Sequence, residues 1–322
     1  MQKDSRIYVA GHRGLVGSAL MRSLHAQGYV NLITRTHADL DLTNQSTVQE
    51  FFEQEKPAYV ILAAAKVGGI LANSTYPAEF IRENLAIQTN VIHESWRAGV
   101  KRLLFLGSSC IYPRDCPQPI KEEYLLTGPL EPTNRPYAVA KIAGIEMCWA
   151  YNRQYGTQYL AVMPTNLYGP GDNFDLANSH VIPALIRKIH EAKERGDPTV
   201  VVWGTGKPRR EFLYSDEMAD ACIHLMNLAD DRFDRLLNEF SSPLVNIGTG
   251  EDLTIRDLAE LVRKEIGYTG DIDWDSSKPD GTPRKLLDVG RIASLGWRAR
   301  VDLQTGLWMA FRDFLGRQAV HG

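Results

Sequence analysis

The most restrictive feature of the sequence is a glycine-spaced turn near its beginning, AGHRGLVG, residues 10–17. The apolar run RIYVAG leads into the turn, and SALMRSLHAQG, with apolar residues at helical spacing, follows it. Gly11, Gly14 and Gly17 let the backbone approach a pyrophosphate and let the helix start close to the strand, with its free N–H groups facing the anion. Because the glycines stand between a strand and a helix, the pattern predicts a dinucleotide site rather than a tight turn alone.

Short apolar runs alternate with helical stretches through the first half of the chain. These runs are nearly continuous in apolar residues, as expected for parallel strands that are covered on both faces. The alternation predicts an α/β fold, a doubly wound parallel Rossmann sheet. We expect strands within 6–11, 31–36, 58–65, 102–109 and 159–171, and helices within 18–28, 80–99 and 137–156.

The strand–helix rhythm weakens after residue 172. We therefore predict a Rossmann domain at 1–172, with a returning segment around 212–250, and a smaller α/β substrate-binding domain at 173–322. Within the second part, TIRDLAELVRKEIG is an amphipathic helix for which Thr254 is the predicted N-cap and Gly267 the predicted stop.

Composition and charge exclude several classes of protein. The net charge of −3 argues against nucleic acid or an anionic membrane as the main partner. No apolar run approaches the roughly 20 residues that span a bilayer, and the first strand begins too early to leave room for a signal peptide. The four cysteines show neither metal-ligand spacing nor a paired framework, so we expect no metal site and a reducing, cytoplasmic location.

Two arginines help to separate the two nicotinamide dinucleotides. An acid usually ends the second strand of an NAD site, whereas an arginine accommodates the 2′-phosphate in an NADP site. Arg35 ends the second predicted strand, Arg13 lies in the glycine turn, and the first acid, Asp39, comes four residues after Arg35. The sequence favours NADP(H) over the alternative of two solvated arginines. The predicted contacts are Arg35 and the turn residues Gly11, His12, Arg13, Gly14, Leu15, Val16 and Gly17.

A tyrosine and a lysine four residues apart, Tyr137 and Lys141 in YAVAK, share one face of a predicted helix. A nearby ammonium lowers the pKa of a phenol, and such a tyrosine can pass a proton to a carbonyl oxygen while hydride reaches the carbon. Ser108, at the end of a predicted strand, could add a hydrogen bond to that oxygen. Together with the glycine turn, these residues predict a carbonyl reductase site.

With these motifs in place, the chain resembles the extended short-chain dehydrogenase/reductase family, and within it the GDP-L-fucose synthases. The similar segments run nearly end to end, and they include LAAAKVGGILANSTYP, LLFLGSSCIYP, MPTNLYGPGDNF, REFLYSDEMA and SKPDGTPRKLLD. The resemblance implies 3,5-epimerisation of GDP-4-keto-6-deoxy-D-mannose, followed by NADPH-dependent reduction of its C4 ketone. Homodimers are common in this family, with a helix bundle that would include residues 137–152.

The resemblance also implies roles for particular residues. Cys110 would be the epimerisation base and His180 the acid, although packing alone could explain Cys110 and helix capping could explain His180. Tyr137 and Ser108 would hold the C4 oxygen. The implied cofactor contacts are Leu106, Gly107, Ser108, Ser109, Lys141, Pro164, Thr165, Asn166, Leu167 and His180, and the implied substrate contacts are Lys188, Trp203, Arg210 and Asp280.

Alternatives within the same family differ at the end of the fourth strand. Sugar-nucleotide dehydratases tend to carry an Asp-Glu pair there, whereas this chain has Ser109 and Cys110. A 4-reductase without epimerisation, or a 4-epimerase, remains the alternative reading, and in a 4-epimerase Cys110 and His180 would be idle. Relatives often have a second basic residue where this chain has His37, which would weaken the preference for NADP or make it depend on pH.

Overall fold

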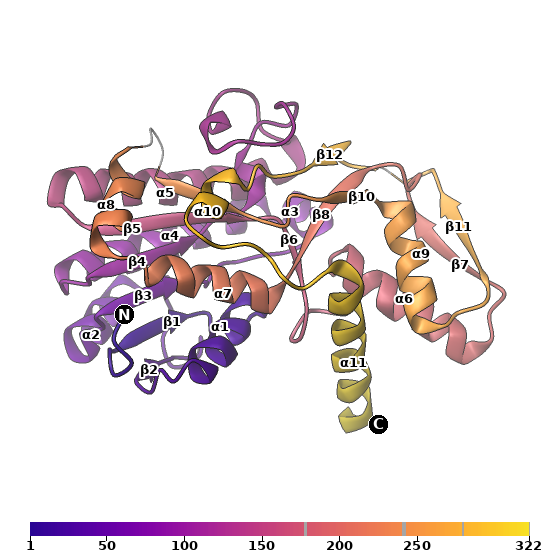
Figure 1. Ribbon diagram of the computed structural model, residues 1–322, viewed down its shortest axis with the longest axis horizontal. Helices are drawn as coiled ribbons and strands as arrows, with labels where there is room; N and C mark the ends of the chain where they lie inside the picture. The colour runs from indigo at the N-terminus through magenta and orange to yellow at the C-terminus, as the bar shows by residue number, and fades with distance from the viewer. Residues whose placement is uncertain (177–178, 240–242, 279, 322) are drawn as a thin grey trace.

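The computed structural model describes residues 1–176, 179–239, 243–278 and 280–321 of the 322-residue chain. Within this part of the chain the largest sheet has six parallel strands in the order β2-β1-β3-β4-β5-β9 (Figure 1). The strands are β1 (Ile7–Ala10), β2 (Leu32–Ile33), β3 (Tyr59–Leu62), β4 (Arg102–Leu106), β5 (Gln158–Pro164) and β9 (Leu244–Ile247).

Helices cover both faces of this sheet. Successive strand residues point to opposite faces, so each strand contributes to two apolar cores. Ile7 and Val9 of β1 pack in one apolar core, and Tyr8 and Ala10 pack in another. The first core includes α1 (Leu15–Ala26), α7 (Ser215–Met226), α8 (Asp230–Asn238) and α10 (Gly290–Ser294), and the second includes α2 (Gln45–Glu55), α4 (Pro77–Arg97) and α5 (Arg135–Tyr155). The predicted doubly wound α/β fold is confirmed.

A second, smaller group of elements extends from one end of the large sheet (Figure 1). At its centre β8 (Arg209–Tyr214) pairs with β6, β10 and β12, while β7 and β11 form a separate pair. A third apolar core joins this group, and Phe212, Leu258 and Phe314 belong to it. The remaining elements are β6 (Asn166–Tyr168), α6 (Val181–Arg195), β7 (Thr199–Trp203), β10 (Asp252–Thr254), α9 (Ile255–Ile266), β11 (Asp271–Asp275), β12 (Arg284–Lys285) and α11 (Leu303–His321).

The distribution of these cores supports a division of the chain near residue 172, which we propose as the domain boundary. The segment around 212–250 returns to the large sheet through α7, α8 and β9. Ile292 and Trp297 also pack in the first core, so a second segment returns as well. Among the described residues, no helix has both the length and the apolar character that a membrane crossing requires.

Local signals in the sequence set several helix ends. The Thr254 hydroxyl accepts a hydrogen bond from the Asp257 N–H (3.0 Å) at the start of α9, and Gly267 ends that helix with φ +69°, so both predicted caps are confirmed. Helix α5 begins at Arg135, two residues before the predicted start, because Pro136 fits the first turn of a helix.

The strand order determines where a ligand can approach. Strands β2 and β3 lie on opposite sides of β1, so the chain leaves the sheet in different directions at the neighbouring carboxyl ends of β1 and β3. In open α/β sheets a ligand binds in the crevice at such a switch point. The glycine turn follows β1 and therefore lies at this edge.

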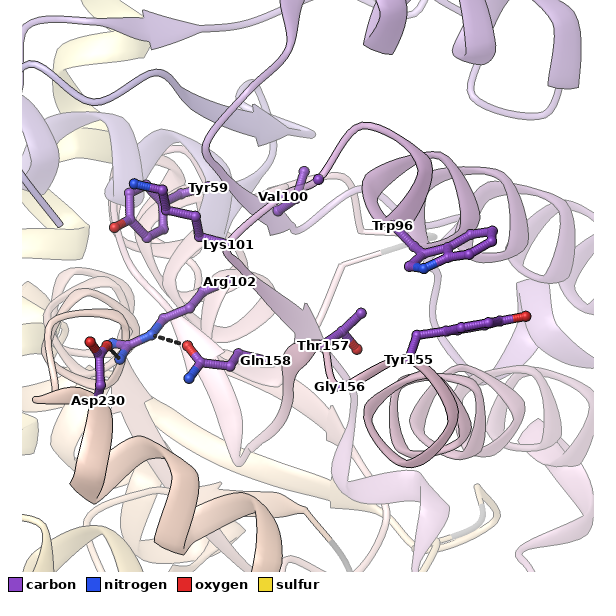
Figure 2. Close-up of a pocket in the computed structure, with 11 residues that line it drawn as sticks. Tyr59, Trp96, Val100, Lys101, Arg102, Tyr155, Gly156, Thr157, Gln158 and Asp230 are labelled. Carbon is purple, nitrogen blue, oxygen red and sulfur yellow. Dashed lines mark hydrogen bonds and ion pairs between the residues drawn. The ribbon is translucent and has the colours of Figure 1, made fainter.

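A buried arginine organises the opposite edge of the sheet, where β3, β4 and β5 begin (Figure 2). The Arg102 guanidinium donates to the carbonyl oxygens of Met226 (2.9 Å) and Leu228 (2.7 Å), where α7 ends, and to the carboxylate of Asp230 (2.6 Å). Met226 is fully buried and Leu228 is 7% exposed, so these main-chain acceptors have little access to water. Arg102 therefore connects β4 to the segment between α7 and α8.

We expect Arg102→Met to lower the free energy of unfolding by about 2–4 kcal/mol, because it leaves buried carbonyl groups without a donor. Urea unfolding followed by circular dichroism measures this change. Lys101→Met, at the exposed neighbouring position, is the matched control and should stay within about 0.5 kcal/mol of the wild type. Equal midpoints and slopes for Arg102→Met and the wild type would contradict this account.

Candidate active site

The glycine turn forms a tight cradle between β1 and α1. A Cβ atom on Gly17 would lie 2.0 Å from the Gly11 carbonyl oxygen, and Gly11 itself has φ +83°. A Cβ on Gly11 would also lie 2.7 Å from the backbone nitrogen of Ala64, which follows β3. Only glycine allows these approaches. They bring the N-terminus of α1 down to the carboxyl end of the sheet, where it can face a pyrophosphate.

A histidine within this turn supplies further evidence for a ligand. Burial, assisted by the nearby Arg13, lowers the pKa of His12, so its imidazole is neutral near pH 7. Its Nδ1 atom is buried and has no hydrogen-bond partner in the described part of the chain. A buried polar atom without a partner is costly. The turn, with this nitrogen and the N-terminus of α1, therefore fits a dinucleotide.

Both predicted 2′-phosphate ligands lie on this side of the sheet. Hydrogen bonds from Thr36 lower the pKa of the Asp39 carboxyl, and Arg13 and Arg35 add to this shift, so both guanidinium groups lie near Asp39. The Arg35 side chain is 37% exposed and also pairs with Glu55. The arrangement fits NADP, since two cations flank the end of β2.

The predicted catalytic residues come together where β4 ends. Ser108 is the N-cap of a short 3-10 helix, η1 (Ser109–Ile111), and its hydroxyl accepts a weak hydrogen bond from the Cys110 N–H (3.5 Å). Across from it, α5 carries Tyr137 and Lys141. The Lys141 ammonium donates to the Leu106 carbonyl oxygen (2.8 Å) and lies 5.8 Å from the centre of the Tyr137 ring. The structure thus places Ser108, Cys110, Tyr137 and Lys141 in one cluster.

The expectation that the Lys141 ammonium lowers the pKa of the Tyr137 phenol is wrong in the described structure. Burial raises the pKa of Tyr137, the charge of a Cys110 thiolate raises it further, and a hydrogen bond from Ser108 only partly offsets the rise. Burial also lowers the pKa of Lys141 to about 8. The Lys141 ammonium donates its hydrogen bond to the Leu106 carbonyl. Desolvation therefore determines the direction of the pKa shift at both Tyr137 and Lys141. Tyr137 is therefore a protonated phenol at neutral pH, and burial makes it a weaker proton donor than a free phenol.

Cys110 lies near two lysines that come from different parts of the chain. Burial raises the pKa of its thiol, whereas Lys285, a hydrogen bond with Ser108 and then Lys141 lower it. Lys285 is paired with Arg210 in the register of β12 and β8. Sequence reasoning missed Lys285 as a site residue, although its segment was part of the resemblance, because nothing local in the sequence shows that the fold brings it near Cys110.

The four predicted substrate contacts also gather, in the smaller part of the molecule. Trp203 is 63% exposed at the end of β7, and the Lys188 ammonium lies 5.2 Å from the centre of its ring. Asp280 accepts hydrogen bonds from the backbone N–H and the hydroxyl of Thr205, both 2.7 Å. Its charge also raises the pKa of Arg210, whose burial lowers it more. An aromatic face and cations side by side suit a nucleotide with a diphosphate.

The other predicted residues lie on both sides of this region. His180 is the N-cap of α6 and has an exposed surface. Desolvation of its imidazole by the surrounding protein lowers its pKa. No hydrogen bond or ion pair within the described residues joins His180 to Cys110. Thr165 and Asn166, which follow β5, donate side-chain hydrogen bonds to the Glu211 carbonyl oxygen (3.1 and 2.8 Å). Pro164 ends β5 and Leu167 lies in β6.

Comparison with known proteins assigns the family. A model of the NAD-dependent epimerase/dehydratase family matches residues 7–238. The chain belongs to this family. It is 59% identical to GDP-L-fucose synthase 1 of Arabidopsis thaliana over 97% of this chain and 94% of that protein, and 54% identical to GDP-L-fucose synthase of Escherichia coli over 97% of each. The resemblance inferred from the motifs is confirmed.

A solved structure shares the fold and the sequence. MlghC, described as a GDP-mannoheptose C4 reductase from Campylobacter jejuni with NADP bound, superposes with a TM-score of 0.90. The two chains are 41% identical, and the match covers 98% of this chain and 99% of that one.

Removing one arginine tests the cofactor contact. We expect Arg35→Ala to raise the KM for NADPH about tenfold or more and the KM for NADH much less, because the guanidinium binds the 2′-phosphate. Arg6→Ala is a matched control, since Arg6 pairs with the same Glu55 carboxylate from outside the turn. Steady-state kinetics with each cofactor measures the ratio. Equal effects of Arg35→Ala on NADPH and NADH would contradict the assignment.

Proposed function

We propose that the protein converts GDP-4-keto-6-deoxy-D-mannose to GDP-L-fucose, by epimerisation at C3 and C5 followed by NADPH-dependent reduction of the C4 ketone. The observation that carries this proposal is the position of Cys110, which lies beside Ser108, Tyr137 and two lysines at the end of β4. Near-full-length identity of 59% to a protein named GDP-L-fucose synthase 1 supports it.

In the first stage the ketone makes the neighbouring C–H groups acidic. Ser108 and Tyr137 donate hydrogen bonds to the C4 oxygen and so stabilise the enolate that forms when a proton leaves C3 or C5. Cys110 accepts that proton as a thiolate, which Lys285 and Lys141 favour against the effect of burial. His180, once its imidazole is protonated, returns a proton to the opposite face of the carbon. Before the second carbon reacts, the thiol gives up its proton and the imidazole takes one up through solvent.

In the second stage the same oxygen becomes an alcohol. NADPH, when bound in the glycine turn, supplies the hydride. Tyr137 donates its phenolic proton to the C4 oxygen, a transfer that burial opposes by raising the pKa of the phenol. Lys141, fixed by the Leu106 carbonyl, supplies positive charge beside the phenolate that remains. One pair of oxygen ligands therefore serves both stages.

A reductase that omits epimerisation is the second candidate, and the structural similarity to a protein described as a C4 reductase favours it. Product analysis separates the two. We expect NMR of the reaction with GDP-4-keto-6-deoxy-D-mannose and NADPH to show GDP-L-fucose. A GDP-6-deoxyhexose that keeps the D configuration at C5 would contradict the epimerase step and support the simple reductase.

Deuterium exchange tests the base directly. In deuterated water, Cys110→Ser should slow exchange at C3 and C5 by about 100-fold or more, since a hydroxyl is a far weaker base. Cys116→Ser, which changes another free thiol nearby in the sequence, should exchange at the native rate. Tyr137→Phe should stop reduction more completely than exchange. Native exchange in Cys110→Ser would show that another group removes the proton.

We also propose a cytoplasmic homodimer. All four cysteines are free thiols, which suits a reducing compartment. Helices α4 and α5 pack together, and Val139 on α5 is 39% exposed. Near the other end of the pair Trp96 and Tyr155 stack at 4.2 Å, with Tyr155 43% exposed. Exposed apolar and aromatic side chains on two adjacent helices suit contact with a second copy.

Light scattering coupled to gel filtration measures the assembly. We expect the wild type to have twice the mass of the chain and Val139→Glu to shift toward the monomer, because a carboxylate in an apolar interface is costly. Val30→Glu is the control, since Val30 is 77% exposed and lies outside α4 and α5. A monomeric wild type would refute the proposed dimer.

A further inference from the structure

Glu211 is a fully buried carboxylate that no step of the proposed reaction uses. It has no exposed surface, and both of its oxygens accept backbone hydrogen bonds. One oxygen accepts from the N–H groups of Thr249 (2.7 Å) and Gly250 (2.8 Å), and the other accepts from Leu287 (2.9 Å). Burial raises the pKa of this carboxyl, while these hydrogen bonds act in the opposite direction. A side chain held in this way connects segments that the chain keeps far apart.

The carboxylate joins the two parts of the molecule. Thr249 and Gly250 follow β9, the last strand of the large sheet, and Leu287 follows β12 of the smaller sheet. Glu211 itself lies in β8, between β10 and β12. The two oxygens therefore fix the chain just before β10 and just after β12, the two strands that flank β8.

Strand β8 and its neighbour β12 carry two cations of the substrate site, Arg210 on β8 and Lys285 on β12. Side chains alternate along a strand, so Arg210 points away from the face that Glu211 occupies. Lys285 is the register partner of Arg210 and comes two residues before Leu287. Lys285 is also the charged neighbour with the largest effect on the Cys110 thiol. A shift of Leu287 would thus move Lys285 relative to both Arg210 and Cys110.

The main-chain carbonyl of Glu211 supports the segment on the cofactor side of the site. Its carbonyl oxygen accepts hydrogen bonds from Thr165 and Asn166, which lie in the segment expected to border the nicotinamide. The carboxylate and the carbonyl therefore support different halves of the site. A substitution of the Glu211 side chain removes the hydrogen bonds of the carboxylate and keeps those of the main-chain carbonyl.

We propose that the Glu211 carboxylate is a positioning residue for the sugar nucleotide: it holds Arg210 and Lys285 where they bind the diphosphate and polarise Cys110. This inference rests on the proposed function for its substrate. It assigns to Glu211 no contact with the substrate, only the alignment of the residues that make contact.

Two variants disturb the carboxylate in different ways. Glu211→Gln replaces one acceptor oxygen with an NH2 group that faces a backbone N–H, so one of the two connections is lost. Gly248→Ala keeps the charge but places a Cβ 2.1 Å from the Glu211 carboxylate oxygen, which must then move. Glu251→Gln makes the same chemical change at an exposed position three residues from Gly248 and is the control.

We expect both variants to weaken GDP binding, measured by calorimetry, about tenfold and to lower kcat/KM for the keto sugar by at least as much. The KM for NADPH should change less than about twofold, because the Glu211 carbonyl still holds Thr165 and Asn166. Glu251→Gln should match the wild type in every measurement.

Several outcomes would overturn the proposal. Native GDP affinity in both variants would show that the carboxylate does not align the cations, and an equal rise in the KM values for NADPH and the sugar would indicate a general loss of structure. If Glu211→Gln does not fold, as judged by circular dichroism, Gly248→Ala decides alone. GDP titration needs no turnover, so a wild type that binds GDP but forms no GDP-L-fucose would refute the proposed function and leave the Glu211 test valid.

Discussion

The contact between Gly17 and the Gly11 carbonyl is the constraint on which the arrangement of this molecule depends. A Cβ on Gly17 would lie 2.0 Å from that oxygen, so α1 can start beside β1 only without a side chain there. The same approach brings the helix N-terminus to the carboxyl edge of the sheet, next to the crevice between β1 and β3. Since the strands of this sheet are parallel, their carboxyl ends share this edge, and the end of β4 brings Ser108 and Cys110 to it.

Desolvation controls the chemistry of that edge more than any single ion pair does. It raises the pKa values of Tyr137 and Cys110 and lowers that of Lys141 to about 8. The phenol would hold its proton at neutral pH without this shift, so burial only makes it a weaker proton donor. The thiol is disadvantaged, because it removes a proton only as thiolate. Burial therefore opposes both stages, and in the proposed mechanism positive charge offsets it at both groups, from Lys141 beside Tyr137 and from Lys285 and Lys141 near Cys110.

The parts of the structure that depend on local signals could be predicted from the sequence. The glycine turn, the caps at Thr254 and Gly267 and the alternation of strands and helices each depend on residues a few positions apart. Lys285 and Glu211 were missed because their partners are distant in the chain and only strand pairing brings them together. The direction of the Tyr137 shift was wrong for a related reason: helical spacing places Lys141 near the phenol, but it does not reveal burial or the Leu106 carbonyl.

The two cations near Cys110 come from different parts of the chain. This suggests how a related enzyme could lose epimerisation and keep reduction. Lys141 comes from α5 of the large unit and lies beside Tyr137, where the proposed reduction uses its charge. Lys285 comes from β12 of the smaller unit, and in the proposed mechanism its charge serves the thiol and the diphosphate. In the proposed mechanism the groups that act on the C4 oxygen come from one unit, whereas proton removal also uses Lys285 from the other. A change that loosens β12 would then weaken proton removal at C3 and C5 before it weakened proton donation at C4, so a reductase could arise from such a fold while every residue of the Tyr137 cluster stays in place.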